Sequence, residues 1–282
     1  MTYRPDLAAY FARIGYAGPT APTVATLDAL ALAHVSAIPF ENLDVLLGRG
    51  VDLDPAAVEA KLIGARRGGY CFEQNSLLLH VLTALGFAAR PLSARVRIDR
   101  ARDFTPARTH VFVRVDTDDG PYLCDVGIGA WSLTSSLRLT LDVEQATAHE
   151  PRRLVADGRW DGLERRGPEA RLFHQIKLGE AWRDVCEFTL EEMPEIDRIV
   201  GNWYTSQHPR SHFRDRLIAA RATPTGRLTL VDRVLTRRTK DGTAATTELA
   251  TWTELRAVLA EQFGLAVPAD LRLATPGLAG LT

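Results

Sequence analysis

The amino-acid sequence predicts an α+β protein built in three parts. Apolar residues recur at helical spacing in the first part, residues 1–87, and alternate as in β-strands over residues 88–194. Residues 195–282 contain both patterns. A chain of 282 residues can bury a large core divided among two or three small domains. We therefore expect a helical N-terminal domain, an antiparallel β-barrel-like middle domain, and an interdomain helix followed by a small α/β lid.

Four helices are expected in the N-terminal part, at residues 5–14, 23–36, 54–64 and 72–85. Glycine and proline residues, which interrupt helices, separate these segments, and Gly86 supplies the stop signal of the last one. The last helix carries its leucines largely on one face, so we expect it to pack into the core.

The middle part has the alternation of an antiparallel sheet. Apolar residues alternate with arginines over residues 94–98, a hairpin follows at 109–126, and strand patterns continue at 137–141, 153–155 and 186–188. No repeat, low-complexity tract or long linker interrupts the sequence. We expect these strands to form one sheet that curls towards a barrel.

The C-terminal part mixes both kinds of element. Residues 195–205 have a helical pattern and are expected to lead the chain out of the barrel. Strands are expected near residues 227–238 and 245–250, with an Asp-Gly turn at 241–242, followed by a helix at 252–263. These elements predict a small α/β unit that lies over the functional site.

Composition and charge argue against several classes of protein. The chain is 46% hydrophobic and 24% charged, which is ordinary for a soluble globular protein. A formal net charge of -1 gives no overall basic field, so nucleic acid is not expected as the main partner. The first residues lack the apolar core of a signal peptide, and no run reaches membrane-spanning length. We expect a cytoplasmic protein that does not bind membranes and is a monomer or a homodimer.

The cysteines and histidines favour free thiols and no bound metal. Cys71, Cys124 and Cys186 are odd in number, widely spaced and form no CxxC pair, which fits a reducing compartment. His208 and His212 are four residues apart, but a proline lies between them and favours a loop. No other His or Cys spacing resembles a zinc site, so we expect no metal.

The segment 66–73, RRGGYCFE, places Cys71 at the start of a predicted helix. At a helix N-terminus the free N–H groups and the macrodipole favour a thiolate, which is the reactive form of cysteine. Gly68 and Gly69 are expected to adopt backbone conformations closed to other residues and to leave space beside Cys71. Most cysteines are nevertheless small buried hydrophobes, so this segment alone does not decide between a catalytic and a structural role.

A base and an orienting group are available downstream. If the loop of the 109–126 hairpin is 117–120, residue 110 faces residue 127, and Asp125 becomes the diagonal neighbour of His110 on the same face. Alone, a strand histidine is usually structural and an aspartate near a turn is often a cap. A thiolate nucleophile needs a proton acceptor that is itself oriented, and this pair supplies both. We interpret the pair as catalytic.

Together with several other motifs, these residues make the sequence resemble the arylamine N-acetyltransferase family. The resemblance covers nearly the whole chain, and its motifs together are highly specific. They are RRGGYCFEQN at 66–75, Thr-His at 109–110, CDVGIG at 124–129, IPFENLD at 38–44 and SQHPRSHF at 206–213. The resemblance implies a cysteine-protease-like Cys-His-Asp core, with Cys71 as nucleophile, His110 as base and Asp125 as orienting carboxylate.

The same resemblance implies the reaction. Acetyl-CoA is expected to acetylate Cys71, and an arylamine, arylhydrazine or N-hydroxyarylamine is expected to take the acetyl group from the thioester. Acetyl-CoA is then a substrate, and no metal is involved. The two steps form a ping-pong mechanism.

Substrate and coenzyme contacts are also implied by the resemblance. The residues expected to bind the acceptor are Phe40, Tyr70, Val96, Ile128 and Phe213. The residues expected to bind the coenzyme are Thr109, Gly127, Gly129 and Ser206, with the Gly-rich turn as an anion-holding loop. By composition alone Phe40 is more often a core residue, and a lone GxG usually marks a turn. Ile128 and Ala130 depart from the commoner form of this turn in the family, in which an aromatic and a third small residue are frequent.

The loop before the nucleophile has a predicted brace. The resemblance implies that Glu41 and Asn42 hold Arg66 or Arg67, whereas the simpler interpretation is a solvated pair. A bidentate arginine–carboxylate contact would fix the loop better than a lysine could.

Three alternatives remain. An amide synthase of macrolactam biosynthesis would keep the triad but take a long acyl chain from a carrier protein. A cysteine hydrolase would cleave a peptide without coenzyme A. A non-catalytic binding protein would retain only the fold, and its Cys71 would be inert to mild alkylation.

Overall fold

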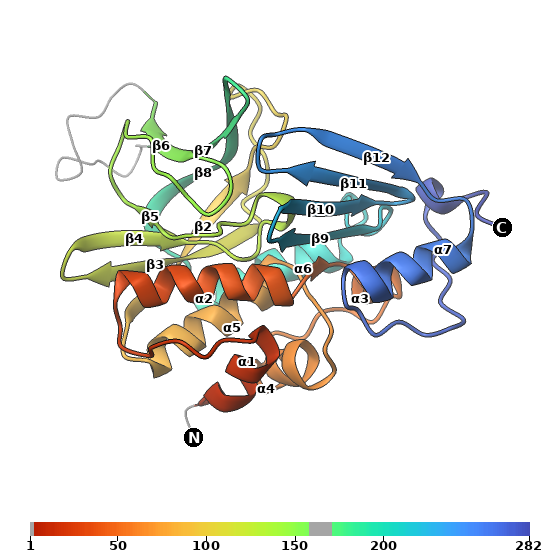
Figure 1. Ribbon diagram of the computed structural model, residues 1–282, viewed down its shortest axis with the longest axis horizontal. Helices are drawn as coiled ribbons and strands as arrows, with labels where there is room; N and C mark the ends of the chain where they lie inside the picture. Colours follow the sequence, from red (N-terminus) through yellow and green to blue (C-terminus); the bar gives the residue numbers. More distant parts are fainter. Residues whose placement is uncertain (1–2, 158–170) are drawn as a thin grey trace.

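The computed structural model describes residues 3–157 and 171–282 and has the predicted α+β architecture (Figure 1). A layer of helices from the N-terminal part lies beneath a seven-stranded antiparallel sheet. A second, five-stranded sheet lies beside the first, with the last α-helix at its edge. The fold therefore consists of two sheets that share one helical base.

The four predicted N-terminal helices are present, each within two residues of the expected bounds. The observed elements are α1 (Leu7–Ile14), α2 (Val24–Ala37), the short α3 (Leu43–Leu46), α4 (Pro55–Glu59), which continues as a π-turn (Ala60–Gly64), and α5 (Cys71–Ala84). Asp6, Thr23 and Asp54 cap the N-termini of α1, α2 and α4. Their side chains accept hydrogen bonds from backbone N–H groups that have no partner within the helix.

The larger sheet confirms the predicted curled antiparallel region. Its order is β5-β4-β3-β2-β8-β7-β6. The strands are β2 (Ala88–Val96), β3 (His110–Thr117), β4 (Gly120–Cys124), β5 (Leu137–Arg138), β6 (Arg152–Ala156), β7 (Leu172–Leu178) and β8 (Ala181–Glu192). A bridge between Leu141 and Leu154 brings its two edges together, so the sheet is nearly closed.

The β3–β4 hairpin has the register that the sequence predicts. Thr117 pairs with Gly120, and Val113 pairs with Cys124. The two residue numbers of each pair add up to the same value, so the antiparallel register is uninterrupted. The continued register sets position 110 opposite position 127. His110 therefore begins β3, and Asp125 directly follows β4, on adjoining sites of one face.

The smaller sheet corrects one expectation and contains one strand that was not expected. It contains β9 (Ile218–Thr223), β10 (Gly226–Val231), β11 (Val234–Thr239), β12 (Ala244–Glu248) and, at its edge, β1 (Phe40–Glu41). The predicted single strand at 227–238 is a hairpin of β10 and β11, which turn at Asp232 with a positive φ of 50°. The motif at 38–44, for which no strand was expected, supplies β1, which pairs Phe40 with Ala220. The remaining helices are α6 (Glu195–Gln207), α7 (Trp252–Ala257), which continues as a π-turn (Val258–Gln262), and two 3₁₀ turns (Gly129–Trp131 and Pro276–Leu278).

Helix α5 is buried in the main core between the other helices and the large sheet. Leu78 and Leu82 of α5 and Val113 of β3 are fully buried in one cluster with Leu27 and Leu30 of α2. Burying this many aliphatic side chains supplies the main driving force for the fold. The packing fixes α5 against β3, so the N-terminus of α5 is held beside the start of β3.

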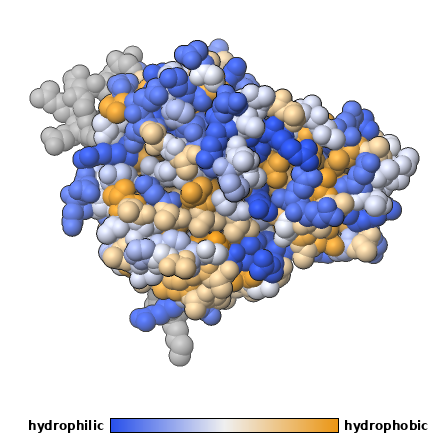
Figure 2. Space-filling view, in the orientation of Figure 1, coloured by the Kyte–Doolittle hydropathy of each residue, from blue (hydrophilic) through white to orange (hydrophobic). Residues whose placement is uncertain are grey.

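The surface facing the viewer mixes polar and apolar residues. Figure 2 shows hydrophilic residues over most of this face, with apolar ones gathered mainly over the helices at the bottom of the view. Among the described residues, no helix combines the length and the apolar composition that crossing a bilayer requires.

Candidate active site

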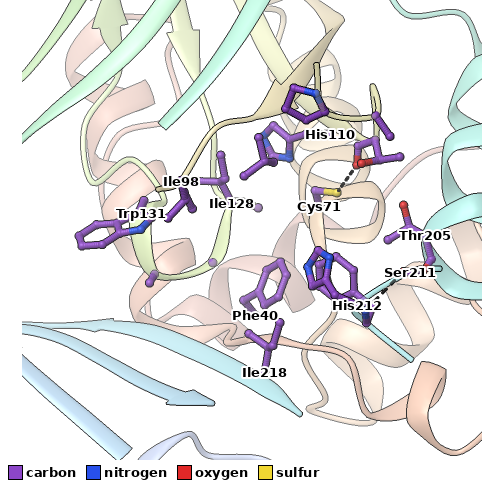
Figure 3. Close-up of a pocket in the computed structure, with 18 of the residues that line it drawn as sticks. Phe40, Cys71, Ile98, His110, Ile128, Trp131, Thr205, Ser211, His212 and Ile218 are labelled. Atoms are coloured by element: carbon purple, nitrogen blue, oxygen red, sulfur yellow. Dashed lines mark hydrogen bonds between the residues drawn. The ribbon is translucent and has the colours of Figure 1, made fainter. Parts of the chain in front are cut away.

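Cys71 is the first residue of α5. Its side chain is 5% exposed, and its Sγ atom lies 3.6 Å from the carbonyl oxygen of Thr109 (Figure 3). The helix start is braced by Glu73, whose Oε2 accepts the backbone N–H of Tyr70 at 3.0 Å. The sulfur is thereby presented at a helix N-terminus, as the sequence predicts.

Glycine is needed at positions 68 and 69 because a side chain there would clash with neighbouring atoms, and not because the backbone has unusual dihedral angles. Neither glycine has a positive φ, which corrects the expectation from the sequence. A Cβ atom on Gly68 would lie 2.1 Å from the carbonyl oxygen of Pro39, and one on Gly69 would lie 2.5 Å from Glu73 Oε2. Gly68 therefore lets the loop pass against the segment that forms β1, and Gly69 leaves room for the side chain of Glu73 on α5.

His110 and Asp125 are in direct contact. His110 Nε2 lies 2.7 Å from Asp125 Oδ2, and the two residues are 1% and 2% exposed. Burial disfavours the imidazolium, but the Asp125 carboxylate outweighs it and, with Cys71, raises the pKa of His110 to about 10. Burial likewise opposes ionisation of Asp125, but His110 and three hydrogen bonds hold the pKa of Asp125 below its usual value. The pair therefore favours a protonated imidazole beside a carboxylate.

Asn75 is a residue that the sequence argument did not single out. Its Nδ2 atom donates to Asp125 Oδ1 at 2.9 Å and to the carbonyl oxygen of Val111 at 2.7 Å, while its Oδ1 accepts the N–H of Val126 at 3.0 Å. Asn75 lies four residues after Cys71 on α5, so both side chains share a helix face. That spacing was the signal that could have identified it.

The Gly-rich turn passes very close to Cys71. The N–H of Gly127 donates to Asp125 Oδ1 at 3.0 Å. A Cβ atom on Gly127 would lie 2.7 Å from the Cα atom of Cys71 and 2.6 Å from Asn75 Nδ2. Glycine at this position lets the turn that follows Asp125 pack against the start of α5.

A cavity of about 500 Å³ opens onto Cys71 and His110 (Figure 3). Seven further residues that the sequence argument assigned to substrate or coenzyme line it, namely Phe40, Val96, Thr109, Gly127, Ile128, Gly129 and Phe213. In Figure 3, Phe40 and Ile218 lie below the cysteine and histidine, and Trp131 and Thr205 lie on opposite sides of them. The wall is drawn from all three parts of the chain.

Tyr70 and Ser206, also predicted to contact substrate or coenzyme, do not line this cavity. Tyr70 is 1% exposed, donates its hydroxyl to Asn202 Oδ1 and packs edge-on against Phe213 at 5.8 Å. Ser206 donates to the carbonyl oxygen of Asn202 at 2.7 Å within α6. Both side chains stand behind the wall and support it, because their polar groups are already satisfied by α6.

Two arginines, Arg100 and Arg210, give the wall positive charge, and no aspartate or glutamate is among the described residues that line the cavity. His212 also lines it, but burial lowers the pKa of its imidazole and favours the neutral form. The guanidinium of Arg100 stacks on the half-exposed ring of Phe104, 5.0 Å from its centroid. Such a wall favours anionic groups near its opening, and sequence reasoning had not identified these residues.

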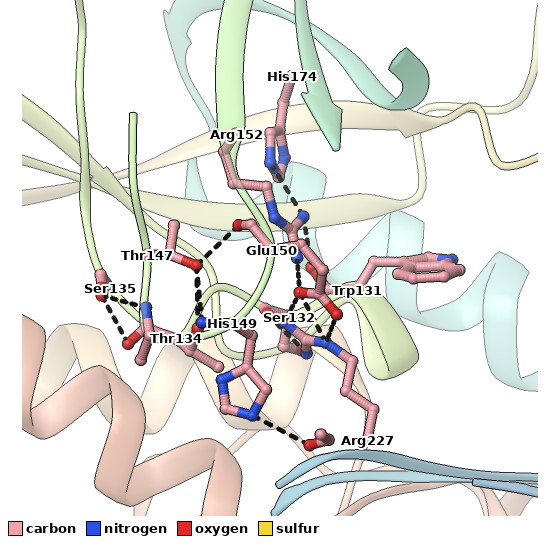
Figure 4. A network of polar contacts seen from close by, with 12 residues as sticks. Trp131, Ser132, Thr134, Ser135, Thr147, His149, Glu150, Arg152, His174 and Arg227 are labelled. Atoms are coloured by element: carbon pink, nitrogen blue, oxygen red, sulfur yellow. Dashed lines mark hydrogen bonds and ion pairs between the residues drawn. The ribbon is translucent and has the colours of Figure 1, made fainter. Parts of the chain in front are cut away.

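A buried network of charges holds Trp131 and Ser132, which directly follow the Gly-rich turn (Figure 4). Arg227 of β10 donates to the Ser132 carbonyl oxygen at 3.0 Å and to the Glu150 carboxylate at 2.7–3.0 Å. Arg152 donates to the Trp131 carbonyl oxygen at 3.1 Å and lies 3.4 Å from Glu150. The network thus ties the segment after the turn to the C-terminal sheet.

The charges in this network are unbalanced, since two arginines share Glu150. Burial and the nearby charge of Arg227 lower the pKa of Arg152 to about 9. Burial opposes ionisation of Glu150, but the hydrogen bonds and charge of Arg227 lower the pKa of that carboxyl to about 2. Asp125 is among the charges that act on Arg152, so the network lies within electrostatic reach of Asp125.

The loop before Cys71 is braced as predicted by Glu41 but not by Asn42. Arg67 contacts Glu41 Oε1 through Nε at 2.9 Å and through a terminal nitrogen at 2.7 Å, and it also reaches Asp44 at 3.3 Å. Asn42 instead donates to the backbone carbonyl oxygens of Phe213 and Arg216, both at 2.8 Å. Asn42 therefore holds the segment after α6, because its side chain points away from the arginine.

The described residues bring together no group of three or more potential His, Cys, Asp or Glu metal ligands. The thiol, imidazole and carboxylate of the site are the types of group that serve as nucleophile, base and orienting group in cysteine enzymes. Chemically, this set fits transfer of an acyl group through a cysteine thioester.

Comparisons with known proteins agree with this geometry. The N-acetyltransferase family matches residues 23–272. An arylamine N-acetyltransferase of Mycolicibacterium smegmatis is 46% identical over 82% of this chain and 81% of its own. A solved structure of M. smegmatis arylamine N-acetyltransferase superposes with a TM-score of 0.87, at 38% identity over 98% of both chains. The Mycobacterium marinum enzyme in complex with CoA gives 0.84, at 38% identity over 92% of this chain and 93% of that one. The chain therefore belongs to the arylamine N-acetyltransferase family of acyltransferases.

Proposed function

We propose that this protein transfers an acetyl group from acetyl-CoA to arylamines and arylhydrazines, and to the oxygen of N-hydroxyarylamines, through an acetyl-Cys71 thioester. The observation that carries the proposal is the opening of one cavity onto both Cys71 and His110, with Asp125 in contact with His110 behind it. Relatives named arylamine N-acetyltransferase and a neighbour solved with CoA support the donor and the acceptor class.

In the first half-reaction Cys71 is acylated. The Nε2–H of His110 donates a hydrogen bond to Asp125, which stays ionised, so Nδ1 is free to take the proton of the Cys71 thiol. The pKa of about 10 favours His110 in the protonated form that this transfer produces. The thiolate attacks the carbonyl carbon of acetyl-CoA, the bond to the coenzyme sulfur breaks, and His110 returns the proton to the departing thiolate.

The second half-reaction forms an amide. The uncharged nitrogen of the arylamine attacks the thioester carbon, the bond to Cys71 Sγ breaks, and the proton lost from nitrogen restores the thiol by way of His110. Exchange between two thioesters is nearly balanced, whereas formation of the amide is downhill. Arylamines stay uncharged at neutral pH, so this step needs little help from a base. Each tetrahedral intermediate needs donors to its oxyanion, and we assign one to the backbone N–H of Cys71 at the helix start.

The resting cavity suits these substrates. Phe40, Ile128 and Phe213 give it an apolar wall with two aromatic rings, which favours the planar ring of an arylamine. Arg100 and Arg210 supply positive charge, which favours the phosphates of the coenzyme.

The test is the intact mass of the purified protein after mixing with acetyl-CoA in the absence of amine. We expect one added acetyl group, its absence in Cys71→Ala, and its removal by an arylamine. Cys71→Ala also controls for acetylation of surface lysines. No adduct, with Cys71 still quickly alkylated, would refute the proposed donor.

Two further reagents separate the alternatives. A long-chain acyl carrier protein that acylates Cys71 when acetyl-CoA does not would identify an amide synthase. Cleavage of a peptide library without any coenzyme would identify a hydrolase. The acetyl-CoA reaction should fail in both of these cases.

A further inference from the structure

Helix α6 carries a row of exposed apolar side chains. Ile196, Ile199, Val200 and Trp203 are 62%, 47%, 58% and 52% exposed. Their spacing places all four on one face of the helix, and we call them the α6 row. The other large hydrophobic residues with comparable exposure in the described part of the chain lie on separate elements, namely Phe104, Val143 and Val234. A contiguous exposed apolar patch of this kind marks an interaction surface.

The opposite side of α6 already has partners within the chain. Gly201 packs against the ring of Phe72, and Asn202 accepts the hydroxyl of Tyr70. Tyr204 and Thr205 line the catalytic cavity. The inner face of α6 is thus fully used by the domain, so the α6 row has no role in the core of its own chain.

The α6 row is symmetric about its own centre. Its members are arranged so that Ile196 and Trp203 are equally distant from the midpoint, which lies between Ile199 and Val200. If two copies of α6 pack antiparallel across a two-fold axis at that midpoint, Ile196 meets the partner's Trp203. Ile199 then meets the partner's Val200. A surface that matches itself in this way is what an isologous interface requires.

The charges at the two ends of α6 are complementary in the same arrangement. Exposed carboxylates gather at its N-terminal end, from Glu191, Glu192 and Glu195. An exposed arginine, Arg214, follows its C-terminal end, whereas Arg210 lines the catalytic cavity. Antiparallel packing sets the acidic end of each copy beside the basic end of the other. The acidic end also disfavours an anionic membrane as the occupant.

We propose that the α6 row is the interface of a homodimer in which α6 of one chain packs antiparallel against α6 of a second copy. Burial of the row removes four large apolar side chains from water in each chain. The interface would lie directly behind the wall of the catalytic cavity, because Tyr204 and Thr205 line that cavity from the other side of the same helix. The dimer does not depend on the reaction that the site performs.

The first test is sedimentation velocity of the parent chain over a wide range of concentration. We expect a species with twice the mass of one chain, which dissociates on dilution. Trp203→Glu and Val200→Glu should each raise the dissociation constant more than about tenfold, since each buries a charge in the interface. Val234→Glu, at a 39% exposed position on β11, is the matched control and should leave the dimer intact. Circular dichroism of each variant checks that it is folded.

A charge exchange tests the orientation of the two helices. Glu191→Arg with Glu192→Arg makes both ends of α6 basic, and Arg214→Glu makes both ends acidic. Each of these two variants alone should dimerise more weakly than the parent. An equal mixture of the two should form heterodimers, because opposite charges then meet at both ends.

Three results would overturn the proposal. The first is a parent chain that stays monomeric at every concentration. The second is a dimer that survives both Trp203→Glu and Val200→Glu, because it would use another face. The third is a monomer that co-sediments with phosphatidylcholine vesicles through the α6 row, which would make a lipid surface the occupant.

Discussion

Asn75 and Asp125 are joined by a 2.9 Å hydrogen bond between the helix that carries Cys71 and the turn that follows β4. The same amide donates to the carbonyl oxygen of Val111, next to His110. One side chain therefore ties together the elements that carry all three members of the triad. We regard Asn75 as a positioning residue, since it acts on the base through the carboxylate.

Asn75→Ala should slow acylation of Cys71 by about ten- to a hundredfold, the cost of a hydrogen bond to a charged group. Without the amide, Asp125 is less stabilised as a carboxylate, so the pKa of His110 should fall. The measurement is the single-turnover rate of acylation as a function of pH, whose profile should shift to lower pH. Ser76→Ala, at the next position of α5, is the control and should reproduce the parental profile.

Asp125→Asn should reduce the acylation rate by about three to four orders of magnitude, because an amide cannot hold the histidine in the tautomer that leaves Nδ1 free. Intact-mass kinetics with acetyl-CoA measure this rate. Cys71 should remain present and alkylatable in the variant. Parental rates in Asp125→Asn would show that the triad assignment is wrong.

The raised pKa of His110 predicts a pH dependence of stability. A histidine whose pKa is about 10 in the folded state and about 6.5 when unfolded stabilises the fold fully below pH 6.5. That contribution is lost as pH rises through 10, so thermal stability should decline over this interval. Asp125→Asn removes the main cause of the shift. The decline measured by thermal unfolding should therefore be smaller in the variant than in the parent.

Gly127→Ala should lower activity strongly, because its Cβ atom would meet the Cα atom of Cys71 at 2.7 Å and force the turn away from α5. We expect a loss of at least about tenfold in acylation, with a destabilisation of about 1–3 kcal/mol. Gly64→Ala is the matched control. A Cβ atom there meets nothing within 4 Å, so parental activity and stability are expected.

Arg67→Lys should lower stability more than chemistry. A lysine cannot reproduce the two contacts of Arg67 with Glu41 Oε1 and the one with Asp44, so we expect a loss of about 1–3 kcal/mol. The rate per folded molecule should change little. Arg66→Lys, on an exposed side chain of the same loop, is the control. Equal melting temperatures for Arg67→Lys and the parent would refute the proposed brace.

Much of the candidate site follows from short stretches of sequence. Cys71 at a helix start depends on local glycine and helix signals, which act within one turn of the chain. The contact of His110 with Asp125 depends only on hairpin register, which the turn at 117–120 specifies. The helices and the order of the three parts could also be predicted, because the apolar periodicity that indicates each element involves residues close together in the sequence.

Other features depend on residues far apart in the sequence. Phe40 and Glu41 form a strand only because β9, almost two hundred residues later, offers an edge. Asn42 contacts Phe213 and Arg216 for the same reason, and the burial of Tyr70 depends on Asn202 of α6. Helix and strand propensities depend on neighbouring residues, so they do not predict contacts between residues this far apart in the sequence.

The sequence by itself determined the family, the α+β class, the place of Cys71 at a helix start and the contact of His110 with Asp125, since each depends on local pattern or a single hairpin. Only the tertiary structure decided why Gly68 and Gly127 must be glycine, how Asn75 joins the triad, and how Arg227 and Glu150 hold the segment that follows the Gly-rich turn. The physical reason is that close packing and buried charge pairing join segments whose separation along the chain carries no information about their distance in space.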